Sequence, residues 1–169
     1  MFERGIRGHT TPTLFQPVVH IPLLIFEPGQ AVRRDVYEPT SAVDLLATLL
    51  AVTGQSEKVP DWTDGRVLPP FAGGSGRRAE AVFSVESKTL KPNQPMTVGT
   101  VAMVEDGYKL IDYFGYPELG GPGERVELYD LRADPGELVD LAGGEEGRVE
   151  AMRARIKAEI ARNDAPFSL

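Results

Sequence analysis

The apolar positions in the first third of the chain predict a strand and then a helix. Residues 18–26 are rich in β-branched and apolar side chains and contain Pro22. Such a run is typical of a strand buried on both faces, as in a parallel sheet, and the proline then lies at the strand's start because it cannot donate to a ladder. Residues 43–52 place apolar side chains on one helical face, between Ser41 as a cap and Gly54 as a stop. A buried strand followed by a buried helix is half of a βαβ layer.

The remainder of the chain predicts a small antiparallel sheet covered by one helix. Four stretches have the pattern of strands, namely residues 79–86, 97–104, 109–114 and 126–130. The sequence Glu105-Asp106-Gly107 predicts a tight hairpin turn, since Asp-Gly tolerates positive φ. Residues 145–162 predict a helix whose apolar stripe consists of Val149, Met152, Ile156 and Ile160. Between the two halves, residues 55–78 predict an ordered linker, with Trp62, Leu68 and Phe71 packed inward.

The composition is that of a globular protein with no affinity for nucleic acid. Of the 169 residues, 41% are hydrophobic and 25% are charged, which suits one domain or part of a larger one. A formal net charge of -7 with scattered Lys and Arg gives no footprint for a phosphate backbone. No apolar run is long enough to span a bilayer. No secretion-signal pattern opens the sequence, which by itself assigns no compartment.

The chain is poor in residues that bind metals or attack substrates. It contains no cysteine and only two histidines, His9 and His20. Disulfides, thiolate metal sites and a cysteine nucleophile are therefore excluded, and a histidine-rich metal site cannot be built from this chain alone. His9 lies among Gly8, Thr10 and Thr11, small residues expected where backbone approaches a ligand, and its imidazole can pair with an anionic oxygen. The alternative is a surface histidine in a Gly/Thr loop.

Other polar residues are interpreted as structural. Asp44 stands where the first helix should begin, so that capping and the helix dipole explain it. Asp130 and Asp134 belong to a turn-forming run, Asp-Leu-Arg-Ala-Asp-Pro. Lys109 is expected to be a solvated strand residue, and His20 precedes the apolar run and is expected to be structural.

Short motifs occur in a fixed order along nearly the whole chain. They are Gly8-His9, Leu14-Phe15-Gln16 with Ile21-Pro22-Leu23-Leu24-Ile25, residues 41–50, Asp64-Gly65-Arg66-Val67-Leu68-Pro69, Tyr108-Lys109-Leu110-Ile111 and residues 127–135. In this order and at these separations they resemble the last third of an arylsulfatase-like sulfatase of the alkaline phosphatase superfamily. Ala47 stands in place of a proline in the helix motif. Two larger departures are Phe15-Gln16 in place of the usual Tyr-Glu, and the start of the chain: in the family, a metal-binding Asp-His or Asp-Asn followed by Gly lies just upstream of the position of Met1.

The resemblance implies a fold class and a division into domains. The expected class is α/β: the end of an alkaline-phosphatase-like α/β sandwich, followed by a small antiparallel sheet packed with a C-terminal helix. Residues 1–72 are expected to be the C-terminal part of the sulfatase main domain. Residues 73–169 are expected to form the C-terminal subdomain.

The resemblance also implies sulfuric ester hydrolysis. In this family a formylglycine, made from Cys or Ser, attacks sulfur with the help of a divalent metal, usually calcium. His9 matches a position that binds a sulfate oxygen and can protonate the leaving group, so it is the predicted catalytic and substrate-binding residue. The nucleophile signature Cys/Ser-x-Pro-x-Arg does not occur in the 169 residues. We therefore expect a fragment that is inactive and binds no metal by itself, with Met1 an internal methionine or the edge of a truncated gene.

Two alternatives stay open. Phosphonate and phosphodiester hydrolases share much of this C-terminal sequence, so the motifs do not choose between sulfur and phosphorus. A non-catalytic interaction module is the other alternative. The expected substrate in the full-length enzyme is a sulfate-ester small molecule or glycan, with no nucleic acid partner and no membrane span. If residues 21–26 are uncovered, they predict self-association.

Overall fold

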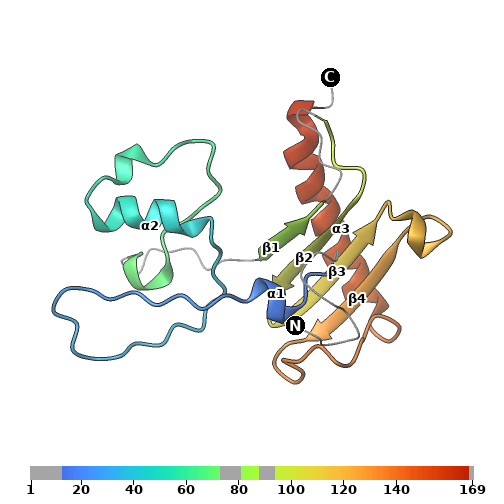
Figure 1. The fold of residues 1–169 in the computed structure, drawn as a ribbon, viewed down its shortest axis with the longest axis horizontal. Coiled ribbons are helices and arrows are strands. Elements are labelled where there is room, and N and C mark those ends of the chain that lie inside the picture. Colours follow the sequence, from blue (N-terminus) through green and yellow to red (C-terminus); the bar gives the residue numbers. More distant parts are fainter. Residues whose placement is uncertain (1–12, 73–80, 88–93, 168–169) are drawn as a thin grey trace. The chain divides into compact units, whose positions relative to one another are not determined.

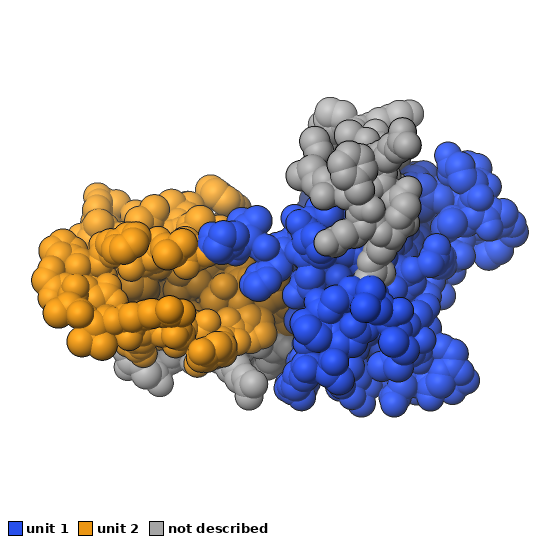
Figure 2. Space-filling view, turned by 60° about the horizontal axis from the view of Figure 1, so that its bottom comes forward, with its two compact units in different colours: residues 1–22, 83–169 blue, residues 23–82 orange. Residues whose placement is uncertain are grey.

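The chain divides into two compact units, which Figure 2 shows in different colours. The computed structural model describes residues 13–72, 81–87 and 94–167. One unit consists of Met1–Pro22 and Phe83–Leu169 and is called the sheet unit below. The other, Leu23–Val82, is called the α2 unit. The expected division of sulfatase domains at residue 72 stays a prediction.

The regular elements of both units appear in Figure 1. The sheet unit contains α1 (Gln16–Val19), β1 (Val82–Glu86), β2 (Gly99–Glu105), β3 (Tyr108–Phe114), β4 (Arg125–Asp130) and α3 (Glu146–Asp164), and the α2 unit contains α2 (Asp44–Val52). Short 3-10 helices span Ser56–Lys58, Pro69–Phe71, Pro117–Leu119 and Ala165–Phe167. Among the described residues, no helix has the length and apolar character that crossing a bilayer requires.

The four strands form one sheet in the order β1-β2-β3-β4. β2 and β3 pair antiparallel from Glu105 opposite Tyr108 onward, and β3 pairs antiparallel with β4. The predicted hairpin is confirmed, since Asp106 and Gly107 both have positive φ, 48° and 82°. A side chain at Gly107 would also collide with Arg132. The four strands and the last helix lie close to their predicted positions.

One face of the sheet is covered by α3, which packs on β2 and β3. Three side chains on this face, Met103, Leu110 and Leu128, have no exposed surface. From the helix, Met152 and Ile156 are buried, as the predicted stripe requires. The sheet and its last helix therefore bury an apolar layer of their own.

The opposite face of the same sheet is covered by the N-terminal segment that contains α1. Leu14 and Phe15 form a cluster there with four residues from the strands, namely Ala102, Ile111, Tyr113 and Tyr129. Side chains alternate between faces along a strand. The central strand β3 is consequently buried on both faces, because α3 covers one and the N-terminal segment covers the other.

The α2 unit buries far less. The predicted helix forms, but its buried residues are Ala47 and Thr48. The apolar side chains expected on its buried face are largely at the surface, and Leu49 is 60% exposed. Leu68 packs inward as predicted, whereas Trp62 is 78% exposed and its predicted inward packing is wrong.

Asp44 has a structural role, as predicted, but the predicted cap by Ser41 is wrong, because the N-cap residue of α2 is Val43 and it forms no side-chain cap hydrogen bond. One carboxylate oxygen accepts the N–H of Ser41 at 2.9 Å, and the other accepts the N–H of Arg66 at 2.9 Å. The Oγ1 of Thr48 accepts the N–H of Leu68 at 2.9 Å. Gly65 must be glycine, because a Cβ there would lie 2.1 Å from a backbone oxygen near the start of α2. These contacts fix the 63–68 segment along the helix.

The predicted strand at residues 18–26 is wrong in this structure. Residues 20–27 have no regular structure, and Phe26 is 87% exposed. A strand buried on both faces needs neighbouring strands and a layer on each side. In the described residues the only sheet is β1–β4, which belongs to the sheet unit. The run is therefore apolar and largely exposed, and it pairs with no strand in the described part of the chain.

Candidate functional site

The predicted site residue, His9, lies outside the described residues, as do its neighbours Gly8, Thr10 and Thr11. The structure does describe the chain that follows it, from Thr13 onward. Apolar contacts and a buried carboxylate fix this following segment to the sheet.

Apolar contacts fix the segment first. Leu14 and Phe15 are 5% and 8% exposed and lie against the strands. The rings of Phe15 and Tyr129 meet edge to face, with centroids 6.0 Å apart. Such ring pairs contribute about 0.5–1.5 kcal/mol beyond their buried area. This part of the motif is thus a packing element of the sheet unit.

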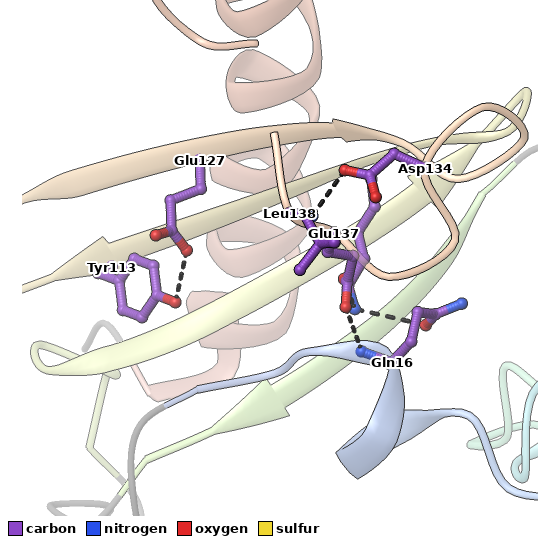
Figure 3. Close-up of polar contacts among 7 residues, drawn as sticks. Gln16, Tyr113, Glu127, Asp134, Glu137 and Leu138 are labelled. Atoms are coloured by element: carbon purple, nitrogen blue, oxygen red, sulfur yellow. Dashed lines mark hydrogen bonds and ion pairs between the residues drawn. The ribbon is translucent and has the colours of Figure 1, made fainter. Parts of the chain in front are cut away.

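A buried carboxylate fixes the segment next (Figure 3). The N–H of Gln16 donates to Oε2 of Glu137 at 2.6 Å. Pro17 has no N–H to place, and the N–H groups of Val18 and Val19 both donate to the carbonyl of Phe15. The N–H of Gln16 has no acceptor within this turn, and the carboxylate of Glu137 supplies one.

The charge of Glu137 is balanced by Lys109, whose Nζ lies 2.7 Å from Oε1. Both side chains are 0% exposed, and the same Nζ lies 3.4 Å from Oε1 of Gln16. The prediction that Lys109 is a solvated strand residue is wrong. Lys109 shares a face of β3 with Ile111 and Tyr113, and the N-terminal segment buries that face.

Glu137 is positioned by a turn built on an aspartate. The N–H of Glu137 donates to the carbonyl of Asp134 at 3.0 Å. Oδ2 of Asp134 accepts the N–H groups of Leu138 and Val139 at 2.6 and 2.8 Å. Oδ1 of Asp130 likewise accepts the N–H of Arg132 at 2.9 Å. The structural interpretation of both aspartates is confirmed.

A second polar group lies on the same face of the sheet. The hydroxyl of Tyr113 donates to Oε2 of Glu127 at 2.9 Å, and Arg125 forms an ion pair with the other oxygen of that carboxylate. Burial raises the pKa of Tyr113 above its ordinary value, and the charge of Glu127 adds to the rise. Tyr113 is therefore a hydrogen-bond donor in this protein at any ordinary pH.

A third polar group lies on the α3 face. Arg153 donates to Oδ2 of Asp112 at 3.0 Å and also pairs with Glu124. Burial raises the pKa of Asp112, and the bond from Arg153 opposes that rise. The same guanidinium lowers the pKa of Glu124. Oδ1 of Asp112 is buried with no hydrogen-bond partner among the described residues.

These groups do not form a metal centre. Across residues 13–72, 81–87 and 94–167, no three His, Asp or Glu side chains gather as metal ligands. The divalent metal that the resemblance implies therefore has no fitting ligand set among these residues. His20 is exposed, and its N–H donates to the carbonyl of Gln16 at the end of α1.

Similarity to known proteins decides the family. No protein-family model matches the sequence. A choline-sulfatase of Rhizobium meliloti is 32% identical over 137 residues, which cover 80% of this chain and 24% of that protein. Arylsulfatase K of Xenopus laevis is 26% identical over 155 residues, 88% of this chain and 27% of that protein. The chain belongs to the sulfatase family. It spans about a quarter of the length of these two relatives.

Solved structures confirm the fold class of this sulfatase chain. A Bacteroides fragilis protein assigned to the sulfatases matches 73% of the chain with a TM-score of 0.55 at 20% identity, using 25% of its own length. A protein in complex with its substrate D-glucosamine-2-N,6-O-disulfate matches 74% with a TM-score of 0.50 at 19% identity, using 25% of its length. Phosphonate monoester hydrolase of Agrobacterium radiobacter matches 78% with a TM-score of 0.51 at 24% identity, using 26% of its length. The mixed α/β fold, with its antiparallel sheet and C-terminal helix, is that of sulfatase C-terminal regions.

Sequence reasoning missed the buried pair of this sulfatase chain, Lys109 and Glu137. One available indication was the alternation in β3, which places Lys109 on the face that carries Ile111 and Tyr113. A lysine on the same strand face as inward-facing residues predicts burial with a counter-charge. The identity of that counter-charge depends on the path of the chain after β4, which no periodic pattern specifies.

Proposed function

We propose that the chain is the C-terminal part of a sulfuric ester hydrolase, in which His9 contacts a sulfate oxygen. The relationship to sulfatases over most of the chain is the observation that carries this proposal. The nucleophile and the divalent metal are assigned to the part of such an enzyme that precedes these motifs. The isolated chain is then expected to be inactive.

The packing of the N-terminal segment supports this role for the sheet unit. Leu14 and Phe15 follow the proposed sulfate-side histidine closely, and both are buried against the sheet. An oxyanion-binding group acts best when its position is fixed before the reaction. The described segment that follows the proposed histidine is packed and hydrogen-bonded, as a preorganised site requires of its supporting residues.

The surface of the α2 unit supports the assignment to a larger enzyme. Leu24 and Phe26 are exposed in the apolar run, and Val43 and Leu49 are exposed on and beside α2. In an α/β sandwich, such side chains belong to an interior made with further strands and helices. We propose that the main domain of the complete sulfatase covers them.

The chemistry proposed for His9 is electrostatic and acid-base. A protonated imidazole neutralises part of the charge on the sulfate oxygens, and the same proton can pass to the departing alkoxide. The reacting ester is a small molecule or a glycan; for one structural neighbour, the substrate is a doubly sulfated glucosamine.

A chimeric enzyme tests the proposal. The part of the Rhizobium meliloti choline-sulfatase that aligns with this chain is replaced by residues 1–169, and hydrolysis of choline sulfate and of an aryl sulfate is measured. We expect activity, and we expect His9→Ala to lower kcat/KM by about 100-fold or more, as for loss of an oxyanion donor. His20→Ala is the matched control and should change kcat/KM by less than about threefold.

The same assays address the alternatives. A second chimera uses the phosphonate monoester hydrolase of Agrobacterium radiobacter as host; activity in this host alone would favour a phosphonate or phosphodiester hydrolase. Turnover of an aryl sulfate by the isolated chain would contradict the expected inactivity. A monomeric, sharply melting chain that supports neither chimera would favour the non-catalytic interaction module.

A further inference from the structure

Lys109, Glu137 and Gln16 form a polar group whose burial limits what it can do. Neither charged side chain is exposed, so neither is placed to contact a substrate in solution. Instead, one carboxylate oxygen faces a lysine ammonium and the other accepts a backbone N–H. The group thus joins the central strand, the turn after β4 and the segment that follows His9.

The polar connection is directional, unlike the apolar contacts around it. Leu14 and Phe15 could slide along an apolar surface with little change in buried area, because the hydrophobic effect is not directional. A carboxylate that accepts one backbone N–H at 2.6 Å specifies which residue lies at that point. In Figure 3 the carboxylate of Glu137 points at the backbone of Gln16.

We propose that Glu137 is a positioning residue. Its carboxylate, balanced by Lys109, fixes the backbone at Gln16 and so sets the register in which the N-terminal segment lies on the sheet. An apolar pair of similar shape would fill the same space without the desolvation that two buried charges require. The retained charges therefore serve placement rather than packing. The extension of this role to His9 rests on the proposed function; the placement of Gln16 does not.

Residue-resolved hydrogen exchange on the full 169-residue chain tests the inference. The quantity measured is the exchange rate of the Gln16 amide relative to the amides of β3, so that a change in global stability cancels. In the unmodified chain we expect Gln16 to be protected to a degree comparable with β3. Exchange of Gln16 as fast as the exposed amide of Phe26 would overturn the proposal without any variant.

Three variants complete the test. Lys109→Met combined with Glu137→Met keeps the volume and removes the acceptor, and it should speed Gln16 exchange relative to β3 by roughly tenfold or more. Glu137→Gln keeps an acceptor oxygen and should leave the ratio within about threefold of the original value. Asp112→Asn, a buried carboxylate on the other face of the same strand, is the matched control and should also leave the ratio unchanged. An unchanged ratio in the double Met variant would overturn the proposal.

The experiments distinguish failure of the proposed function from failure of the positioning role of Glu137. If the chimera is inactive, or is insensitive to His9→Ala, the proposed function fails and the exchange result at Gln16 stands. If Gln16 exchange does not depend on Glu137, the positioning role fails whatever His9 does. If the double Met variant does not fold, Gln16 exchange in the unmodified chain can still overturn the positioning role.

Discussion

The sheet unit and the α2 unit differ in how far their large apolar side chains are buried. In the sheet unit, Leu110 of β3 is 0% exposed, because α3 covers the face of the sheet on which it lies. In the α2 unit, Leu49 on α2 is 60% exposed, and the apolar run around Phe26 is uncovered.

The difference shows what each unit contains. A sheet with a layer on each face carries its own interior, even for charged residues such as Lys109 and Glu137. The α2 unit has a helix and an apolar run but no sheet of its own among its described residues, so it holds only one half of an interface. This agrees with a chain that spans about a quarter of the length of its sulfatase relatives.

The largest effect is expected from breaking the buried pair of the sheet unit. Lys109→Ala leaves Glu137 buried and charged without its partner, which should lower the free energy of unfolding by about 3–5 kcal/mol. Urea unfolding followed by circular dichroism measures this loss. Lys58→Ala, at an exposed lysine of the α2 unit, is the control and should stay within about 0.5 kcal/mol. Equal effects would mean that the pair is not buried in solution.

A matched pair of leucine substitutions compares the two units directly. Leu110→Ala removes a fully buried side chain and should cost about 2–5 kcal/mol, because a cavity remains. Leu49→Ala removes an exposed side chain and should change the free energy of unfolding by less than about 0.5 kcal/mol. Thermal or urea unfolding of both variants gives the two values. A comparable loss at Leu49 would show that the α2 unit has an interior of its own.

The apolar run predicts self-association of the isolated chain. Leu24→Ser combined with Phe26→Ser removes two exposed apolar side chains and should weaken association by about tenfold or more, since each buried side chain contributes about 1.5–3 kcal/mol. Sedimentation velocity over a range of concentrations measures the change. Leu110 and the rest of the sheet unit are untouched, so the unfolding transition should stay where it was. A chain that is monomeric before substitution would contradict this prediction.

The smallest effect concerns pH and the α3 face. Because burial raises the pKa of Asp112, the folded chain takes up a proton there more readily than the unfolded chain does. The contribution of Asp112 to stability should therefore rise as pH falls through its folded pKa and decline as pH rises. Asp112→Asn should remove this dependence, so that the difference in unfolding free energy between the original chain and the variant grows toward acid pH. Glu124 keeps Arg153 as its partner in both proteins, so the contribution of Glu124 to the pH dependence largely cancels when the two unfolding free energies are subtracted.

The regular elements of the sheet unit could be predicted because they follow local rules. The strand-like stretch 109–114, the Asp106-Gly107 turn and the stripe on α3 are local sequence patterns that need no knowledge of distant residues. These patterns also predicted which helix residues, Met152 and Ile156, would be buried.

The failures share one physical cause. A pattern tells which side chains are suited to burial, and burial itself depends on whether a covering layer belongs to the same chain. Residues 21–26 and Trp62 had the right pattern and no cover. Lys109 had a polar side chain and a complete cover. The candidate site depended on the motif around His9 alone, and that role stays a prediction.

At position 137, the backbone conformation and the partners of the side chain favour different amino acids. The φ of Glu137 is 53°, in the left-handed region. Glycine adopts this region without steric strain, whereas a residue with a side chain does so at a cost in free energy. The backbone conformation thus favours glycine, whereas Lys109 and the Gln16 amide require a carboxylate at this position. Glycine would relieve the turn and leave a lysine buried without a counter-ion. In this chain a glutamate occupies the position, so the contacts with the distant partners outweigh the local backbone preference.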